Sequence, residues 1–121
     1  MTTRMTKRLA LGIATMVAVV GAGAAPAEAN PNAPLLGPGS TGHGVWCVQG
    51  GLNFVAGAGL VQDSIYGQAT YNAVLNFQRY FHMTYQDGIV GPETGSFLGY
   101  LVDLRVPHLW EDDGCWDAVP S

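Results

Sequence analysis

The sequence has 121 residues, enough for one domain and too few for two, and 48% of them are hydrophobic. Its formal net charge at pH 7 is −4, and only five residues are Lys or Arg. So few basic residues form no positive stripe for nucleic acid or for anionic lipid, which excludes both kinds of partner. Any ligand must therefore be held by shape, by stacking and by hydrogen bonds.

Residues 1–29 have the pattern of a secretory signal peptide. Three basic residues precede an apolar run over 9–25, and the sequence Ala-Glu-Ala at 27–29 has the small residues of a cleavage site. A membrane anchor is the alternative, which Pro26 and the glycines before it disfavour. Cleavage after Ala29 would remove three of the five basic residues and one of the nine acidic ones, so the net charge would change from −4 to −6. We expect a secreted protein, extracellular or associated with the cell wall, without membrane contact after cleavage.

The chain has two cysteines, Cys47 and Cys115. In an exported protein, an even pair predicts one disulfide. This bond would close most of the mature chain into one loop and would stabilise it by about 4 kcal/mol in the chain-entropy treatment. A metal pair is the alternative, but the three histidines are scattered and offer no ligand spacing, so we expect neither a metal nor a cofactor.

Residues 30–44 are rich in Pro, Gly and Asn and predict an extended N-terminal arm. A helix is predicted over 45–55, because its apolar residues recur at helical spacing. They are Val45, Val48, Leu52 and Val55. Gly50 and Gly51 lie on the opposite side, where each costs a helix roughly 1 kcal/mol relative to Ala. We therefore expect the C-terminal tail to pack closely against these glycines; the alternative is that they end the helix early.

The frame Asp-x-Ile-x-Gly-x-x-Thr occurs twice, as DSIYGQAT at 63–70 and as DGIVGPET at 87–94. We interpret each copy as the start of a helix. The Asp accepts backbone N–H groups and closes a turn, and the Ile is expected to be buried. The Gly is the N-cap of the helix. In the second copy a Pro follows this Gly directly, and Pro suits the first helical position. The residues with these structural roles are Asp63, Gly67, Asp87 and Gly91.

The segments after both copies have helical periodicity. The first runs to about Phe81 and is expected to bury Val74, Phe77 and Phe81; the second is expected to bury Phe97, Leu98, Leu101 and Leu104. We therefore predict an all-α fold, a small three-helix bundle with a pseudo-repeat of turn plus helix. Residues 103–121 are predicted to be an irregular acidic C-terminal tail, tied down by the disulfide.

Three segments, taken in order, resemble a known family. They are GSTGHGVWCVQGGLN, DSIYGQATYNAVLNFQ and DGIVGPET. Together they are similar to the peptidoglycan-binding domain of the first type, a three-helix module, over about residues 36–102. The resemblance implies non-catalytic binding to the glycan and stem peptide of the bacterial cell wall. Such modules usually accompany a cell-wall hydrolase, which is the protein partner that the resemblance suggests. The chain departs from the family at Gly95, where an aromatic residue is common, and in its cysteine pair.

Gln49 and Gln78 each stand at the edge of an apolar stripe. A buried amide must find hydrogen-bond partners, so we favour a structural role, in which these side chains satisfy backbone groups between helices, over contact with a ligand.

A ligand groove is predicted between the two repeat loops. Exposed aromatic rings stack on sugar faces, and amide side chains bond to amides. The candidate ligand-binding residues are Tyr66, Tyr71, Tyr85, Gln86 and Asn53. The alternative is that these tyrosines are ordinary half-buried packing residues.

No catalytic set is recognised, so we expect that the protein is not an enzyme. Glycan hydrolysis needs two placed carboxylates, whereas Glu111, Asp112 and Asp113 cluster in one predicted loop. Two functions remain for an expected monomer. One is a secreted protein that binds peptidoglycan; the other is a stand-alone secreted inhibitor or regulator that binds a cell-wall enzyme, or another protein, through the same scaffold.

Overall fold

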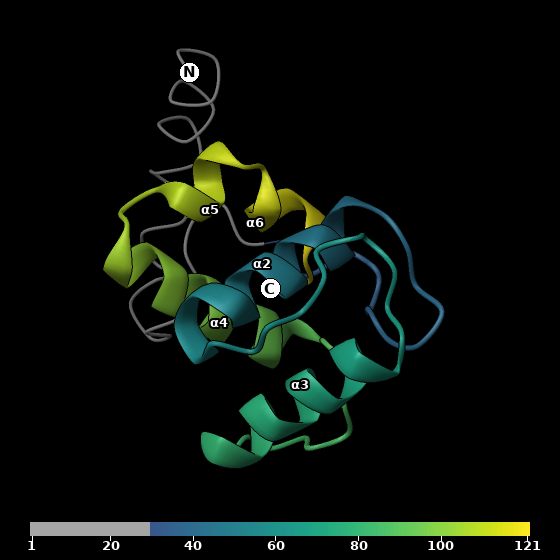
Figure 1. Cartoon of the computed structure of the whole chain (residues 1–121). Helices are drawn as coiled ribbons and strands as arrows, with labels where there is room; N and C mark the ends of the chain where they lie inside the picture. The colour runs from purple at the N-terminus through teal and green to yellow at the C-terminus, as the bar shows by residue number, and fades with distance from the viewer. Residues whose placement is uncertain (1–29) are drawn as a thin grey trace.

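The computed structural model of the chain describes residues 30–121, and the predicted signal peptide over 1–29 lies outside them. The described part is all-helical (Figure 1). Its helices are α2 (His43–Ala56), α3 (Gln68–Tyr80), α4 (Pro92–Arg105), α5 (Leu109–Asp112) and α6 (Cys115–Ala118). Over this range only three isolated β-bridges occur, and no helix is long and apolar enough to cross a membrane. The predicted all-α class is confirmed.

The helix α2 is the central element and packs against α3, α4 and α6. Figure 1 shows it between the short helices α5 and α6 on one side and α3 on the other. Its apolar stripe is buried as predicted, with Val45, Val48 and Leu52 at most 1% exposed. The stripe packs against Val74 of α3 and Leu98 of α4, which belong to the same core cluster.

The two repeat copies start α3 and α4. Gly67 and Gly91 are the N-caps of these helices, both with extended backbone. Pro92 takes the first position of α4, where its missing N–H costs no hydrogen bond, and Glu93 in the first turn faces the positive end of the helix dipole.

Three residues that were predicted to be buried are exposed. Ile65 of the first repeat copy is 56% exposed, so the buried role predicted for the Ile of each copy is wrong there. Phe81 is 39% exposed because α3 ends at Tyr80, so that Phe81 is already the C-cap and leaves the helical phase. Leu104 is 61% exposed because the buried face of α4 runs through Leu98 and Val102 instead. At about 100° per residue, Leu104 points roughly 200° away from Val102.

The C-terminal segment was predicted to be irregular. This prediction is wrong, because the segment contains α5 and α6. The predicted disulfide between Cys47 and Cys115 is present and joins α2 to α6. Trp110 and Trp116 are buried, and their rings meet edge to face with centroids 5.3 Å apart. Single-turn helices carry no hydrophobic period that a sequence could reveal, so their position depends on these tertiary contacts.

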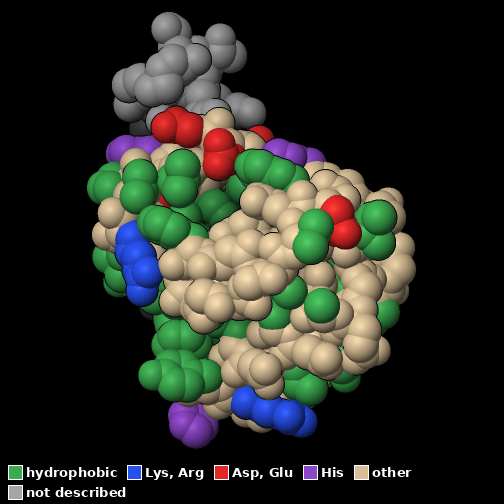
Figure 2. Space-filling view, in the orientation of Figure 1, with side chains coloured by type: hydrophobic (Ala, Val, Ile, Leu, Met, Phe, Trp, Pro, Cys, Tyr) green, Lys and Arg blue, Asp and Glu red, His purple; other side chains and the backbone are tan. Residues whose placement is uncertain are grey.

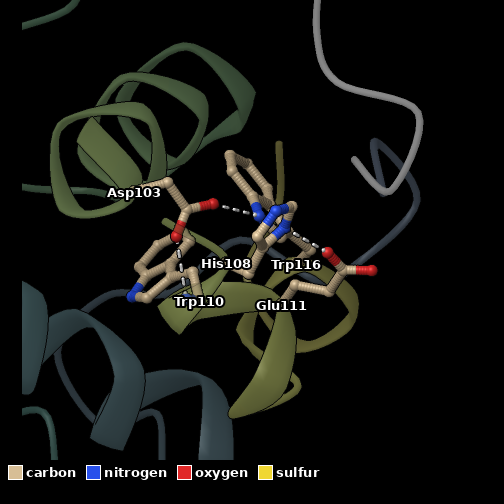
Figure 3. Close-up of polar contacts among 5 residues, drawn as sticks. All are labelled: Asp103, His108, Trp110, Glu111 and Trp116. Carbon is tan, nitrogen blue, oxygen red and sulfur yellow. Dashed lines mark hydrogen bonds and ion pairs between the residues drawn. The ribbon is translucent and has the colours of Figure 1, made fainter. Parts of the chain in front are cut away.

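Asp103 of α4 fastens this C-terminal segment. One carboxylate oxygen accepts the backbone N–H of Trp110 at 2.9 Å, and the other accepts the indole N–H of Trp116 at 3.1 Å (Figure 3). The same view shows His108 and Glu111 paired at 3.1 Å beside them.

The C-terminal segment rests on glycines of α4 rather than on Gly50 and Gly51. A Cβ atom added at Gly95 would lie 1.8 Å from the carbonyl oxygen of Pro120, and one added at Gly99 would lie 2.3 Å from the ring of Trp110. These distances leave no room for any side chain. The predicted contact at Gly50 and Gly51 is wrong, since Gly50 meets Gln62 and Gly51 meets Leu98. On α2 the glycine that meets the C-terminal segment is Gly44, where an added Cβ atom would lie 2.6 Å from the carbonyl oxygen of Ala118.

Candidate functional site

The first repeat loop is held by the buried side chain of Gln49. Its amide nitrogen donates to the Asp63 carboxylate and to the Ile65 carbonyl, each at 3.0 Å, and to the Thr70 hydroxyl at 3.1 Å. Its amide oxygen accepts the backbone N–H of Ser64 at 3.0 Å. One side chain from α2 thus bonds to four residues of the frame that starts α3.

Gln78 of α3 repeats this arrangement in the second loop. Its amide nitrogen donates to the Ile89 carbonyl at 2.8 Å, to the Thr94 hydroxyl at 3.0 Å and, at 3.4 Å, to the Asp87 carboxylate. Its oxygen accepts the N–H of Gly88 at 2.8 Å. We call these two networks the glutamine clamps. The described residues contain no buried side-chain nitrogen or oxygen without a hydrogen-bond partner.

Asp63 and Asp87 close their own turns within the clamps. Each accepts, at 3.0 Å, the backbone N–H of the Ile two residues further on. This backbone bond, with the donation from Gln49, holds the pKa of Asp63 below its usual range. Both carboxylates are therefore occupied in shaping the loops.

The second residue of each frame lies in the left-handed backbone region. Gly88 has φ 75°, which glycine adopts without strain, whereas Ser64 has φ 66° at the equivalent position of the first copy. The glycine is needed in the second copy for another reason: a Cβ atom there would lie 2.2 Å from the ring of Tyr71.

Two of the predicted groove tyrosines join the repeat loops instead of lining a groove between them. Tyr66 is only 1% exposed, and its hydroxyl donates to the carbonyl of Gly88 in the other copy. Burial raises the pKa of this hydroxyl well above its usual value. Tyr71 covers the same glycine. No groove can open here without breaking the contact between the two copies, so the groove prediction is wrong for Tyr66.

The other predicted ligand residues lie apart from one another. Tyr85 is 68% exposed and lines a separate hollow of about 440 Å³ beside the start of α4. The Gln86 amide donates to the Met83 carbonyl at 3.2 Å. The Asn53 side chain accepts the N–H of Leu60 at 2.7 Å and donates to its carbonyl at 2.9 Å, so it closes the loop after α2.

A groove lies between the end of α2, the loop after it and α3. Its volume is about 660 Å³, within the range of roughly 300–1,000 Å³ that is typical of small-molecule sites. Representative lining residues are Val55, Leu60, Asn72, Asn76, Phe77 and Tyr80. We call it the α2–α3 groove. The sequence alone did not predict this groove. The one signal that could have indicated it is that Asn72, Asn76 and Tyr80 recur every fourth residue on the exposed face of α3.

One cluster with metal-ligand chemistry is occupied by other bonds. Ligand atoms of His43, Cys47 and Cys115 lie within 4.8 Å of one another. The two sulfur atoms form the disulfide, and Nε2 of His43 lies 2.7 Å from the carbonyl oxygen of Asp113, to which it donates. This cluster therefore stabilises the attachment of the C-terminal segment to α2.

Comparisons with known proteins agree with the fold. The family described as "Putative peptidoglycan binding domain" matches residues 48–98, which contain both glutamine clamps. No curated protein matches the chain with significance. Among solved structures, the crystal structure of the SleB N-terminal domain is similar, with 27% identity and a TM-score of 0.54 over 59% of this chain and 96% of that one. The resemblance of the motifs is thus confirmed: residues 48–98 match the peptidoglycan-binding family model, and the fold is similar to that of the SleB N-terminal domain.

Proposed function

We propose that this chain is a secreted, non-catalytic protein that binds bacterial peptidoglycan. The observation that carries the proposal is the family match over residues 48–98, which spans α3 and most of α2 together with both complete clamps. The α2–α3 groove lies on the same two helices and gives this domain a hollow large enough for one or two units of a polymer.

The roles of the acidic side chains support a binding function without catalysis. Asp63 and Asp87 close turns, Asp103 holds two tryptophans, and Glu93 accepts the backbone N–H and the hydroxyl of Thr84. Hydrolysis of a glycan needs one carboxylic acid and one carboxylate placed on either side of the bond to be cleaved. Side chains that hold the fold in this way are poorly placed to move a proton to a substrate.

The disulfide supports export. A structural disulfide forms and persists in oxidising compartments, such as the space outside the cell membrane. The bond joins α2 to α6, so reduction would remove the covalent link between the C-terminal segment and the central helix.

The proposal is tested by pelleting the oxidised protein with bacterial cell walls before and after the walls are treated with trypsin. We expect the same pelleted fraction in both cases, because the ligand is the polymer. Loss of pelleting after trypsin would contradict the proposal and would favour the alternative, a regulator or inhibitor that binds a wall protein. Incubation with purified sacculi should release no reducing sugar and no free amine; release of either would show catalysis.

A further inference from the structure

The α2–α3 groove has no charged lining. The residues around it are apolar, aromatic or amide-bearing, and none is Asp, Glu, Lys, Arg or His. On the face shown in Figure 2, charged side chains are few and lie mostly toward the margins. A charged ligand group that entered this groove would lose water and gain no opposite charge, which is costly.

This lining distinguishes between the two components of peptidoglycan. The stem peptide carries carboxylates and, in many walls, a free amine. The glycan strand offers hydroxyl groups, acetamido groups and the apolar faces of its sugar rings. A groove without charge is chemically complementary to the glycan and not to the charged ends of the peptide.

Two asparagines supply hydrogen bonds in the groove. Asn72 and Asn76 are exposed and one helical turn apart on α3. The Asn72 oxygen accepts from Gln68 at 3.0 Å, which leaves its NH₂ group free to donate. The amide of Asn76 makes no hydrogen bond within residues 30–121. An amide with both a free donor and a free acceptor can pair with the acetamido group of a sugar.

Aromatic rings form one end of the groove and continue beyond it. Tyr80 is 77% exposed and meets Phe81 edge to face at 4.9 Å between centroids. The row continues from Phe81 to Phe97 at 4.8 Å and from Phe97 to Tyr100 at 6.5 Å. A polymer that leaves the groove at this end would therefore pass over further rings, on which sugar faces can stack.

We propose that the α2–α3 groove is a subsite for an N-acetylated hexosamine unit of the glycan strand, and that the strand continues over the aromatic row toward Tyr100. The proposal rests on the proposed function and specifies its ligand as the glycan rather than the stem peptide. Asn76 bonds to the acetamido group, and the ring of Tyr80 stacks on the sugar.

The test titrates the oxidised protein with soluble N-acetylglucosamine oligomers of two and four units and, separately, with a stem pentapeptide, by calorimetry and amide NMR shifts. We expect binding of the oligomers and none of the peptide. Asn76→Ala and Tyr80→Ala should each weaken binding roughly threefold to tenfold, since each removes one neutral hydrogen bond or one stacking contact. Tyr100→Ala should weaken binding of the tetramer but not of the dimer.

Tyr85→Ala is the matched control, because it removes an exposed tyrosine from the separate hollow. It should bind the oligomers as the unchanged protein does. All four substituted positions are exposed, so the Tm of each variant should be close to that of the unchanged protein. If Asn76→Ala or Tyr80→Ala has a lowered Tm, it is replaced by Asn76→Ser or Tyr80→Ser.

Three results would overturn the inference: binding of the pentapeptide but not of the oligomers, oligomer binding that is weakened by Tyr85→Ala but not by the groove variants, or no binding of either probe. Pelleting with cell walls shows whether only the subsite proposal fails or whether the proposed function fails as well. If the unchanged protein and the groove variants pellet equally well, wall binding stands and the subsite lies elsewhere. If the unchanged protein neither pellets nor binds a probe, both proposals fail.

Discussion

Replacement of Gln78 by alanine should destabilise the protein far more than an average substitution. Gln78 is 0% exposed and makes hydrogen bonds to the Gly88 N–H, the Ile89 carbonyl and the Thr94 hydroxyl. Gly88 and Thr94 are themselves buried, so both would lose a partner that water cannot replace. Each orphaned buried group costs about 1–3 kcal/mol, and the cavity adds to this. We expect the free energy of unfolding to fall by about 3–5 kcal/mol.

Urea denaturation followed by tryptophan fluorescence measures this change. In a domain of this size, 1 kcal/mol corresponds to roughly 4–8 °C in Tm, so thermal unfolding should show a fall of at least about 12 °C. Gln49→Ala should cost a similar amount, because the first clamp has the same bonds. Gln68→Ala is the control: Gln68 is exposed and bonds only to Asn72, so we expect a loss below about 0.5 kcal/mol.

A loss below about 1 kcal/mol for Gln78→Ala would refute the reasoning. It would mean that the second loop is held mainly by its contacts with the N-terminal arm, such as the paired bonds between Leu36 and Val90 at 3.1 and 2.8 Å. A large loss in Gln78→Ala with none in Gln49→Ala would show that the two copies are not energetically equivalent.

Three further predictions concern the C-terminal segment and the first clamp. Gly95→Ala should lower the free energy of unfolding by about 2 kcal/mol or more in urea denaturation, although alanine favours helices, because the new methyl group meets the Pro120 carbonyl. Substitution of both Cys47 and Cys115 by serine should cost about 4 kcal/mol in the same assay. The lowered pKa of Asp63 contributes stability at neutral pH that is lost as the pH falls below about 4. Compared with the unchanged protein, Asp63→Asn should therefore have a lower Tm at pH 7 and a smaller fall in Tm between pH 5 and pH 2.5.

Each of these three predictions would be contradicted by a specific result. Unchanged stability of Gly95→Ala would show that the end of the chain does not rest on α4. A cysteine variant as stable as the oxidised protein would show that packing alone holds the C-terminal segment. Parallel curves of Tm against pH for Asp63→Asn and the unchanged protein would show that its carboxylate is not linked to folding.

Local patterns predicted most of the fold. Val45, Val48 and Leu52 recur at helical spacing, and that spacing is independent of any distant contact. The glycines before α3 and α4 and the two cysteines likewise report local or covalent requirements. The structural role favoured for Gln49 and Gln78 agrees with their bonds, although the pattern could not name their partners.

The errors concern contacts between distant segments. Tyr66 looks like a loop tyrosine that could meet a ligand, and only the position of Gly88 in the other copy shows that it turns inward. Gly95 is a departure from the family pattern whose reason appears only when Pro120 is placed against it. The α2–α3 groove combines residues of two helices with a loop, and its shape depends on how far apart the helices lie.

Direct binding to peptidoglycan is measured by pelleting the oxidised protein with purified, protein-free sacculi. The pelleted fraction is followed over a series of protein and salt concentrations. We expect saturable binding that changes little with salt, because shape, stacking and hydrogen bonds hold the polymer. Soluble glycan strands should compete for this binding. If no protein pellets at any salt concentration, the chain does not bind peptidoglycan.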